Sequence, residues 1–300
     1  MDRDNTPPVP SGLPPALAAY VMWGFLPVYL LLVREVPPFE FVGWRIIWTL
    51  PVCLLIVAWR KQGPDLRVAL ADRRSLLLLA GSATLIGINW LVYVWAIQRG
   101  EVLAASLGYY INPLLNVVLG TVFLRERLTR LQWLAVALAA CGVGLLLGGA
   151  LTTLWISLTL AMSFGFYGLL RKQVVVGSVP GLTIETAILL PPALAIAWYY
   201  AGTPAGPAFG QDLGLSLAIM LGGVITAVPL LMFAVAARRL DYSVLGMIQF
   251  IAPTIVFVLG LTLFGQPLDW LQLACFVLIW SALAVFVWDL LARRRAASAG

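Results

Sequence analysis

The segment SLGYYINPLLNVVLG, residues 106–120, carries a stripe of polar side chains in an otherwise apolar run. These polar residues recur at steps of three or four, so they lie near one face of a helix. They are Ser106, Tyr109, Asn112 and Asn116. Pro113, within the same run, leaves one backbone carbonyl without its usual helical donor. A helix breaker beside polar groups is typical of a membrane helix that lines a solute path.

Part of this segment matches GMIQFIAPTIVFVLG, residues 246–260, at an offset of 140 residues. Apolar segments can match by chance, but these copies and their flanks also share a proline, a glycine, a glutamine and loop charges. The matching pairs are Ile111/Ile251, Pro113/Pro253, Val118/Val258, Leu119/Leu259, Gly120/Gly260, Leu128/Leu268, Leu131/Leu271, Gln132/Gln272, Leu138/Leu278, Arg99/Arg239 and Glu101/Asp241. We therefore expect two copies of one structural unit.

The composition is that of a protein embedded in a bilayer. Of 300 residues 62% are hydrophobic, against 19 Lys and Arg and 13 Asp and Glu. A spanning helix needs about 20 mostly apolar residues, and ten apolar runs meet this need. They are 14–33, 40–59, 75–97, 102–124, 131–148, 154–170, 182–200, 214–237, 243–264 and 270–290. The predicted fold class is an all-α integral membrane protein with ten transmembrane helices.

The repeat divides these spans into two five-helix units, predicted at 14–148 and 154–290, with tails at 1–13 and 291–300. Five spans per unit force the two copies into opposite orientations, which is the inverted-repeat plan of many secondary transporters. Sixteen Lys and Arg residues fall on the side of the termini, two fall on the opposite side, and Arg45 lies within a span. The positive-inside rule therefore predicts a protein of the inner or plasma membrane with both termini in the cytoplasm.

Several function classes are excluded by what the sequence lacks. It contains no histidine and no GxxxxGK[ST] loop, so imidazole-based metal sites, Ser-His-Asp triads and ATP hydrolysis are not expected. Its three cysteines lie in apolar runs, and its basic residues are divided among short loops, so neither a cofactor nor a nucleic acid is indicated. An integral-membrane lipid-modifying enzyme is one alternative, but it would need clustered carboxylates or His, and the acidic residues here are single ones beside Arg. A non-transporting membrane assembly subunit is a second alternative, which stays open.

Six ordered stretches spread over both halves carry a family resemblance. They are NWLVYVWA (89–96), SLGYYINPLLNVVLG (106–120), ERLTRLQWLAV (126–136), SFGFYGLLRK (163–172), IETAILLPP (184–192) and GMIQFIAPT (246–254). The chain resembles the EamA branch of the drug/metabolite transporter superfamily, and within it the RarD type. The resemblance implies two inverted five-helix repeats and transport, more often export, of a small organic molecule, drug or metabolite. One departure is that Glu126, the acidic residue after the fourth span, corresponds to Gln266 in the second copy.

Polar and aromatic residues at helical spacing within the spans are the candidate solute-binding residues. They are Tyr20 and Trp23; Asn89 and Tyr93; Tyr109, Asn112 and Asn116; Ser163 and Tyr167; and Gln249. Interhelical hydrogen bonding is the structural alternative for such groups. If these faces meet, they form a pocket of rings, amides and hydroxyls that suits an uncharged or amphipathic organic solute.

Arg45 is the basic residue that lies well inside a predicted span. It either snorkels to the interface or forms a structural ion pair. The functional alternative is a counter-ion for a substrate carboxylate or phosphate, with Glu40 or Glu185 as its resting partner. Either acid is also a candidate carrier of a coupled proton.

Two further features predict contacts with neighbours in the membrane. Ala140, Gly144 and Gly148 form a small-residue face suited to close helix packing, which we expect inside the bundle, with a homodimer as the alternative. The basic segment 60–74 is expected to form a loop helix that attracts anionic lipid.

The predicted topology is testable by thiol labelling. In a background without the native cysteines, cysteines at positions 150 and 206 are expected to react with an impermeant reagent from outside the cell. Cysteines at 67 and 298 are expected to stay unlabelled because their loops face the cytoplasm. Strong labelling at 67 from outside would reverse the orientation.

Overall fold

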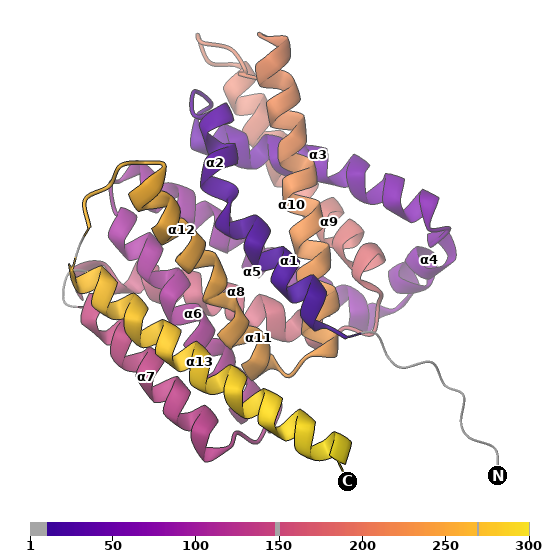
Figure 1. Ribbon diagram of the computed structural model, residues 1–300. Coiled ribbons are helices and arrows are strands. Elements are labelled where there is room, and N and C mark those ends of the chain that lie inside the picture. The colour runs from indigo at the N-terminus through magenta and orange to yellow at the C-terminus, as the bar shows by residue number, and fades with distance from the viewer. Residues whose placement is uncertain (1–10, 148–150, 269, 300) are drawn as a thin grey trace, which may run out of the picture.

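The computed structural model describes residues 11–147, 151–268 and 270–299, and its elements are helices (Figure 1). They are α1 (Leu13–Gly24), α2 (Leu26–Leu30), η1 (Leu31–Val33), α3 (Pro38–Trp59), α4 (Gly63–Ala71), α5 (Arg73–Gln98), α6 (Val102–Phe123), α7 (Arg130–Leu147), η2 (Leu151–Thr153), α8 (Leu154–Gln173), α9 (Ser178–Ala201), α10 (Leu213–Arg239), α11 (Tyr242–Gln249), α12 (Ile251–Thr262) and α13 (Trp270–Ala299). Within the described residues, 9 segments are long and apolar enough to cross a membrane, and the bent α1–α2 pair gives a tenth. The all-helical membrane fold is thus confirmed.

Two of the spans are broken where proline removes a backbone donor. Pro27 has no N–H for the carbonyl of Trp23, and the first span bends by 41° between α1 and α2. Pro253 likewise leaves the carbonyl of Gln249 without its helical donor, and α11 ends there. Proline alone does not break a span, since Pro113 lies inside the continuous helix α6.

Several helices extend beyond the predicted apolar limits. Helix α8 continues to Gln173 and α13 to Ala299, so the predicted tail at 291–300 is helical over its described part. Charges stop an apolar run but not a helix, because Arg and Lys have high helix propensity. The predicted loop helix is present as α4, and Asp72 after it caps α5 by accepting hydrogen bonds from the backbone N–H groups of Arg74 and Ser75. Its hydrogen bonds with Ser75 lower the pKa of Asp72.

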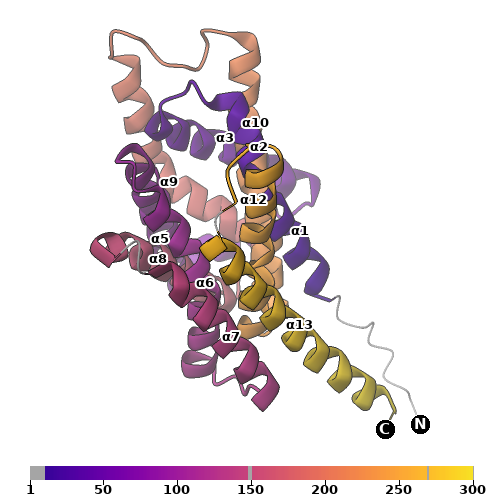
Figure 2. The same cartoon turned by 60° about the vertical axis from the view of Figure 1, so that its left-hand side comes forward.

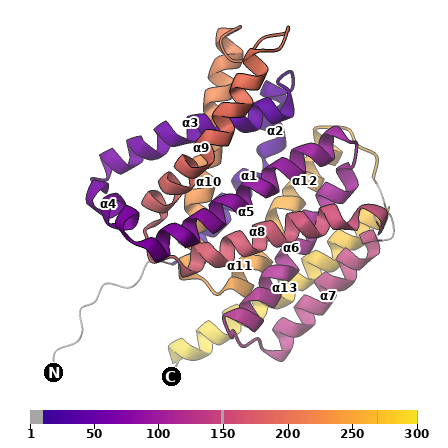
Figure 3. The ribbon, with the colours of Figure 1, turned by 180° about the vertical axis from the view of Figure 1, so that it is seen from behind.

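The helix contacts follow the pattern expected of two related copies. Corresponding helices pack on each other: α3 on α9, α6 on α11, and α7 on α13. Helix α8 contacts α5 and α6, as α1 contacts α10 and α12. If the two five-helix units are exchanged, the contacts α3–α9, α6–α11 and α7–α13 are unchanged. The contacts of α8 with α5 and α6 become those of α1 with α10 and α12. Figure 2 shows α7 and α13 side by side, and Figure 3 shows α5 beside α8.

The same backbone turn also occurs twice, 140 residues apart. Arg125 has a φ of 56° and Gly265 a φ of 61°. Beside them, the N–H of Glu126 donates to the carbonyl of Gly120 at 3.0 Å, and that of Gln266 to Gly260 at 2.9 Å. These matched turns support the prediction of an internal repeat.

Helix α7 packs through a different face from the one predicted. Ala139 and Gly142 are buried against α13, and a Cβ at Gly142 would lie 2.9 Å from the carbonyl oxygen of Cys275. Ala140 and Gly144 are exposed, and Gly148 lies outside the described residues. The expectation that this face packs inside the bundle was wrong for Ala140 and Gly144, because the helix turns their neighbours toward α13.

The closest helix approach predicts the largest effect of adding one methyl group. A Cβ at Gly223 of α10 would collide with the backbone of Trp48 and Thr49 in α3, whereas at Gly144 it would meet nothing within 4 Å. Gly223→Ala is expected to lower the free energy of unfolding by about 1–3 kcal/mol. Gly144→Ala, the matched control, is expected to raise it by about 0.5–1 kcal/mol through helix propensity. Thermal unfolding in detergent measures both, and equal melting temperatures for the two variants would contradict this packing.

Candidate functional site

A cavity of about 200 Å³ opens between α2, α3 and α5. Arg34 and Pro38, at the turn between η1 and α3, are exposed and form its mouth. We call this side of the molecule the α2–α3 end; it is at the top of Figure 1. The walls are mostly apolar. Of the lining residues of α3 and α5, Arg45 and Trp90 are the farthest along each helix from the mouth. We call this space the Arg45 cavity.

The guanidinium of Arg45 lies on the ring of Trp90, with 4.1 Å from Cζ to the ring centroid. Its Nε is buried without a hydrogen-bond partner. The ion pair found among the described residues joins Arg171 to Glu185. No carboxylate of these residues therefore lies within 4.0 Å of the Arg45 guanidinium nitrogens. Arg45 therefore lines the cavity with a positive charge that has no acidic partner among the described residues.

Two of the predicted site residues lie near Arg45. Tyr93 lines the Arg45 cavity, and its ring packs edge-on against Tyr109 with centroids 5.7 Å apart. The polar stripe of α6 is thus connected to this cavity through the contact between Tyr109 and Tyr93.

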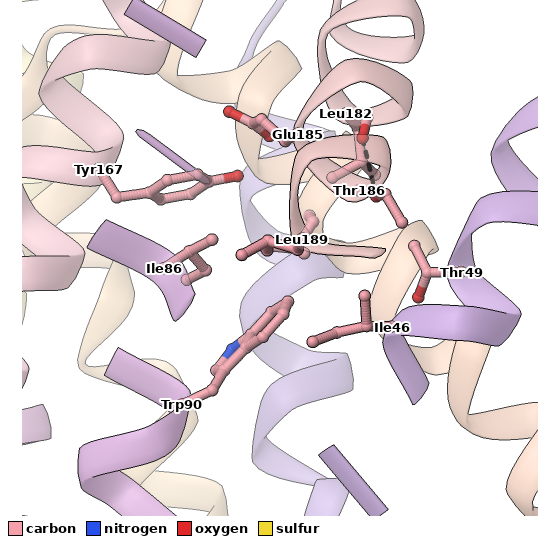
Figure 4. Close-up of a pocket in the computed structure, with 10 residues that line it drawn as sticks. Ile46, Thr49, Ile86, Trp90, Tyr167, Leu182, Glu185, Thr186 and Leu189 are labelled. Carbon is pink, nitrogen blue, oxygen red and sulfur yellow. Dashed lines mark hydrogen bonds between the residues drawn. The ribbon is translucent and has the colours of Figure 1, made fainter. Parts of the chain in front are cut away.

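A second, much smaller space lies beyond Trp90. It measures about 10 Å³ and is lined from both halves of the chain, by α3 and α5 and by α8, α9 and α10 (Figure 4). In this view Tyr167 and Glu185 lie on its upper side and Trp90 lies on its lower side. We call it the Glu185 pocket. Because Trp90 borders both spaces, it separates the Arg45 cavity from the interface between the halves.

Glu185 forms a buried ion pair with Arg171. The distance from Arg171 Nη1 to Glu185 Oε1 is 3.5 Å, and both side chains are at most 2% exposed. Ser82 of α5 donates to the same carboxylate oxygen, and Arg171 Nη2 donates to the carbonyl of Ser178 at 3.2 Å. Glu185 Oε2 is buried without a partner. A Cβ on Gly181 would collide with the guanidinium, so this glycine provides the room for the pair.

The predicted amides form hydrogen bonds between helices. Asn116 Nδ2 donates to Gln249 Oε1 at 2.9 Å and to Asn112 Oδ1 at 3.2 Å. Asn112 donates to the backbone of α8 at 2.7 Å, and Asn89 donates to Ser163 Oγ at 3.0 Å. All five side chains are at most 5% exposed. In this conformation they join α5, α6, α8 and α11, and their contact with solute stays a prediction.

The remaining candidates belong to a buried aromatic cluster. Tyr20 and Trp23 of α1 have ring centroids 5.6 Å apart, and Tyr167 of α8 stacks on Phe233 of α10 at 6.0 Å. The hydroxyls of Tyr20 and Tyr167 are buried without a hydrogen-bond partner. Tyr167 thus lines the Glu185 pocket, whereas Tyr20 and Trp23 are not among its lining residues.

The opposite side of the bundle is tied together by charged groups. Ala69 of α4 packs there with Leu79, Val174 and Ile184, and we call this side the α4 end. The carboxylate of Glu126 accepts the N–H of Ser243 at 2.8 Å and its hydroxyl at 2.6 Å, at the start of α11.

Two cations add to this closure. Lys172 donates to the carbonyl of Ala237 at 3.0 Å, and Arg238 donates to that of Val176 at 3.0 Å. These contacts link the ends of α6, α8 and α10 and the start of α11.

Comparison with known proteins assigns the chain to a family. Residues 10–148 match the EamA-like transporter family. The chain is 44% identical to the uncharacterized transporter PA0485 of Pseudomonas aeruginosa, over 91% of this chain and 92% of that protein. The chain belongs to the EamA-like transporter family. It is also 41% identical to Protein RarD of Escherichia coli, over 94% of this chain and 96% of that protein.

Two further similarities agree with this assignment. The chain is 32% identical to the chloramphenicol-sensitive protein RarD of Pseudomonas aeruginosa, over 91% of this chain and 92% of that protein. A crystal structure at 19% identity matches its fold with a TM-score of 0.73, over 94% of this chain and 98% of that chain. This EamA-family chain is thus a multi-pass membrane protein of a transporter family that carries small solutes.

The structure corrects the predicted partners of Arg45. Glu185 is paired with Arg171, and Glu40 accepts the indole N–H of Trp44 at 3.0 Å and the N–H of Ala208. Neither acid forms an ion pair with Arg45.

Sequence reasoning also missed two residues. The predicted span 154–170 ends one turn before α8 does, so it excludes Arg171. The candidate residues include Asn89 but not its neighbour Trp90. The spacing of Trp90 from Tyr93, Val94 and Ile97 places these residues on one face of α5, and this spacing could have identified Trp90 as a cavity residue.

The buried ion pair predicts a compensating double substitution. Arg171→Gln or Glu185→Gln alone is expected to cost about 3–5 kcal/mol of stability, because each leaves a buried charge unpaired. The double variant is expected to recover most of this loss, and Arg239→Gln, which changes an exposed arginine at the end of α10, serves as control. Thermal unfolding in detergent checks this. A double variant as unstable as the worse single one would show that the charges do not stabilise each other.

Proposed function

We propose that this protein is a secondary transporter that moves a small organic solute across the inner or plasma membrane by alternating access. The observation that carries the proposal is the unequal state of the two ends. The Arg45 cavity reaches the surface at the α2–α3 end, whereas hydrogen bonds of Glu126, Lys172 and Arg238 hold the α4 end together. A carrier open to one side at a time has this arrangement.

The orientation follows from the charge distribution. We propose that the α4 end faces the cytoplasm, because the basic residues gather there and in the tail after α13. Both termini are then cytoplasmic, the Arg45 cavity faces outward, and the structure represents an outward-open state.

The solute path is proposed to run from the Arg45 cavity past Trp90 to the Glu185 pocket. Opening the α4 end would require the contacts between α6, α8 and α11 to rearrange. The amides Asn112, Asn116 and Gln249 lie in those contacts, and hydrogen bonds of this kind contribute only about 0.6–2 kcal/mol each in membranes. They can therefore exchange partners or meet solute during the cycle.

Glu185 is the better-placed candidate for a coupled proton. It lies at the interface of the two halves, where its Oε2 is buried without a partner. Glu40 lies in the first turn of α3 instead, and its Oε1 accepts hydrogen bonds from Trp44 and Ala208. Protonation would remove the attraction of Glu185 for Arg171 at the closed end. Export is the direction that we propose from the family resemblance.

Transport by purified protein tests the function. Proteoliposomes loaded with radiolabelled amino acids, monocarboxylates and chloramphenicol are expected to release at least one of these solutes faster than protein-free liposomes. The rate is expected to depend on an imposed pH gradient in the parent protein and to lose that dependence in Glu185→Gln. Folded protein that releases none of them faster than protein-free liposomes would favour a non-transporting membrane subunit.

A further inference from the structure

We propose that the Arg45 cavity binds an organic monoanion, and that Arg45 pairs with the carboxylate of a solute that has a ring-sized apolar body. This inference names the substrate class of the proposed transporter and rests on that function. It begins from the charge balance of the membrane-embedded residues.

The two embedded arginines differ in how their charge is compensated. Arg171 is paired with Glu185, and its guanidinium fits a space kept free by Gly181. Arg45 has no acidic partner among the described residues, although it lies in the second predicted span. An unpaired charge at such a depth is costly, and such residues mark substrate or ion pathways. The structure thus leaves one cation available to an anion that comes from outside the chain.

The acid closest to Arg45 in sequence, Glu40, makes its hydrogen bonds with other groups. Glu40 begins α3 five residues earlier, and it accepts hydrogen bonds from Trp44 and from the backbone of Ala208. These bonds hold the carboxylate toward the α9–α10 loop. Five residues is also a poor spacing for a pair on one helix.

Trp90 holds the guanidinium in a defined position. The guanidinium carbon lies 4.1 Å from the centroid of the ring, and this cation–π contact offsets part of the charge without using the N–H donors. The donors lie at the edge of the plane, and Nε has no partner. A carboxylate can accept two parallel hydrogen bonds from such an edge.

The remaining walls fit an apolar body better than an inorganic ion. They include Leu30, Phe41, Val94 and Ile97, with the ring of Tyr93 beside them. One fixed cation matches one negative charge, so a carboxylate fits better than a phosphate dianion. Arg34 at the mouth adds positive potential, which the exposed Glu35 beside it partly offsets.

A snorkelling arginine would behave differently. It would turn its guanidinium to the headgroups and would be replaceable by lysine. Here the guanidinium instead lies over Trp90, a residue that also lines the Glu185 pocket.

Ligand binding to the detergent-purified full-length protein tests the inference without requiring transport. Phenylacetate is expected to raise the melting temperature and to bind at least about tenfold more tightly than phenylacetamide or 2-phenylethylamine, which match its size. Arg45→Gln is expected to abolish this preference, and Arg45→Lys to weaken it because Lys lacks the planar fork. Arg99→Gln, an exposed arginine over Trp95 of the same end, is expected to keep it.

The outcomes separate the inference from the proposed function. Equal binding of phenylacetate and phenylacetamide by the parent protein would overturn the inference, whether or not Arg45→Gln folds. Tighter binding of phenyl phosphate would overturn the carboxylate assignment. Selective carboxylate binding without release from proteoliposomes would retain the site and reject the transporter. Release of neutral solutes alone from proteoliposomes would retain the transporter and reject the carboxylate site.

Discussion

The hydrocarbon core tolerates neither an unpaired charge nor an unsatisfied backbone group, and this constraint shapes the whole molecule. It accounts for the exclusively helical spans and for the confinement of most charges to loops. Where the chain breaks a helix, at Pro27 and Pro253, the break lies inside the bundle or beside the cavity. Where it buries a charge, at Arg171, it supplies Glu185, Ser82 and the space of Gly181. Arg45 departs from this pattern, and the cavity lies beside it.

The two ends of the bundle use polar groups in opposite ways. At the α4 end, Glu126 accepts hydrogen bonds at the start of α11, and Lys172 donates to the carbonyl of Ala237 near the end of α10. In the second copy the residue that matches Glu126 is Gln266, which has no charge to attract a helix N-terminus. The repeat is therefore symmetric in its backbone turn and asymmetric in its charge. This difference gives a physical reason for one end to be held closed while the other admits solute.

The sequence predicted the fold more completely than the site. Apolar runs and matched loop charges identify the spans and the repeat, because membrane helices must be apolar and loops collect charge. The partner of Glu185 could not be predicted, since the end of α8 differs from the end of its apolar run by one turn. The pairing of Asn116 with Gln249 depends on which faces of α6 and α11 meet, and one sequence does not record that. The stripe of α6 was identified, but the structure distributes it between an interhelical network at Asn112 and an aromatic contact at Tyr109.

Access to single cysteines from each side of the membrane tests the account most directly. In a background without native cysteines, Val94→Cys reports on the Arg45 cavity and Thr186→Cys on the Glu185 pocket. With an impermeant thiol reagent, Val94→Cys is expected to react from outside and not from inside. Thr186→Cys is expected to react from inside only while a transported solute is present. Reaction of Val94→Cys from inside in the absence of solute would contradict an outward-open cavity closed at its cytoplasmic end.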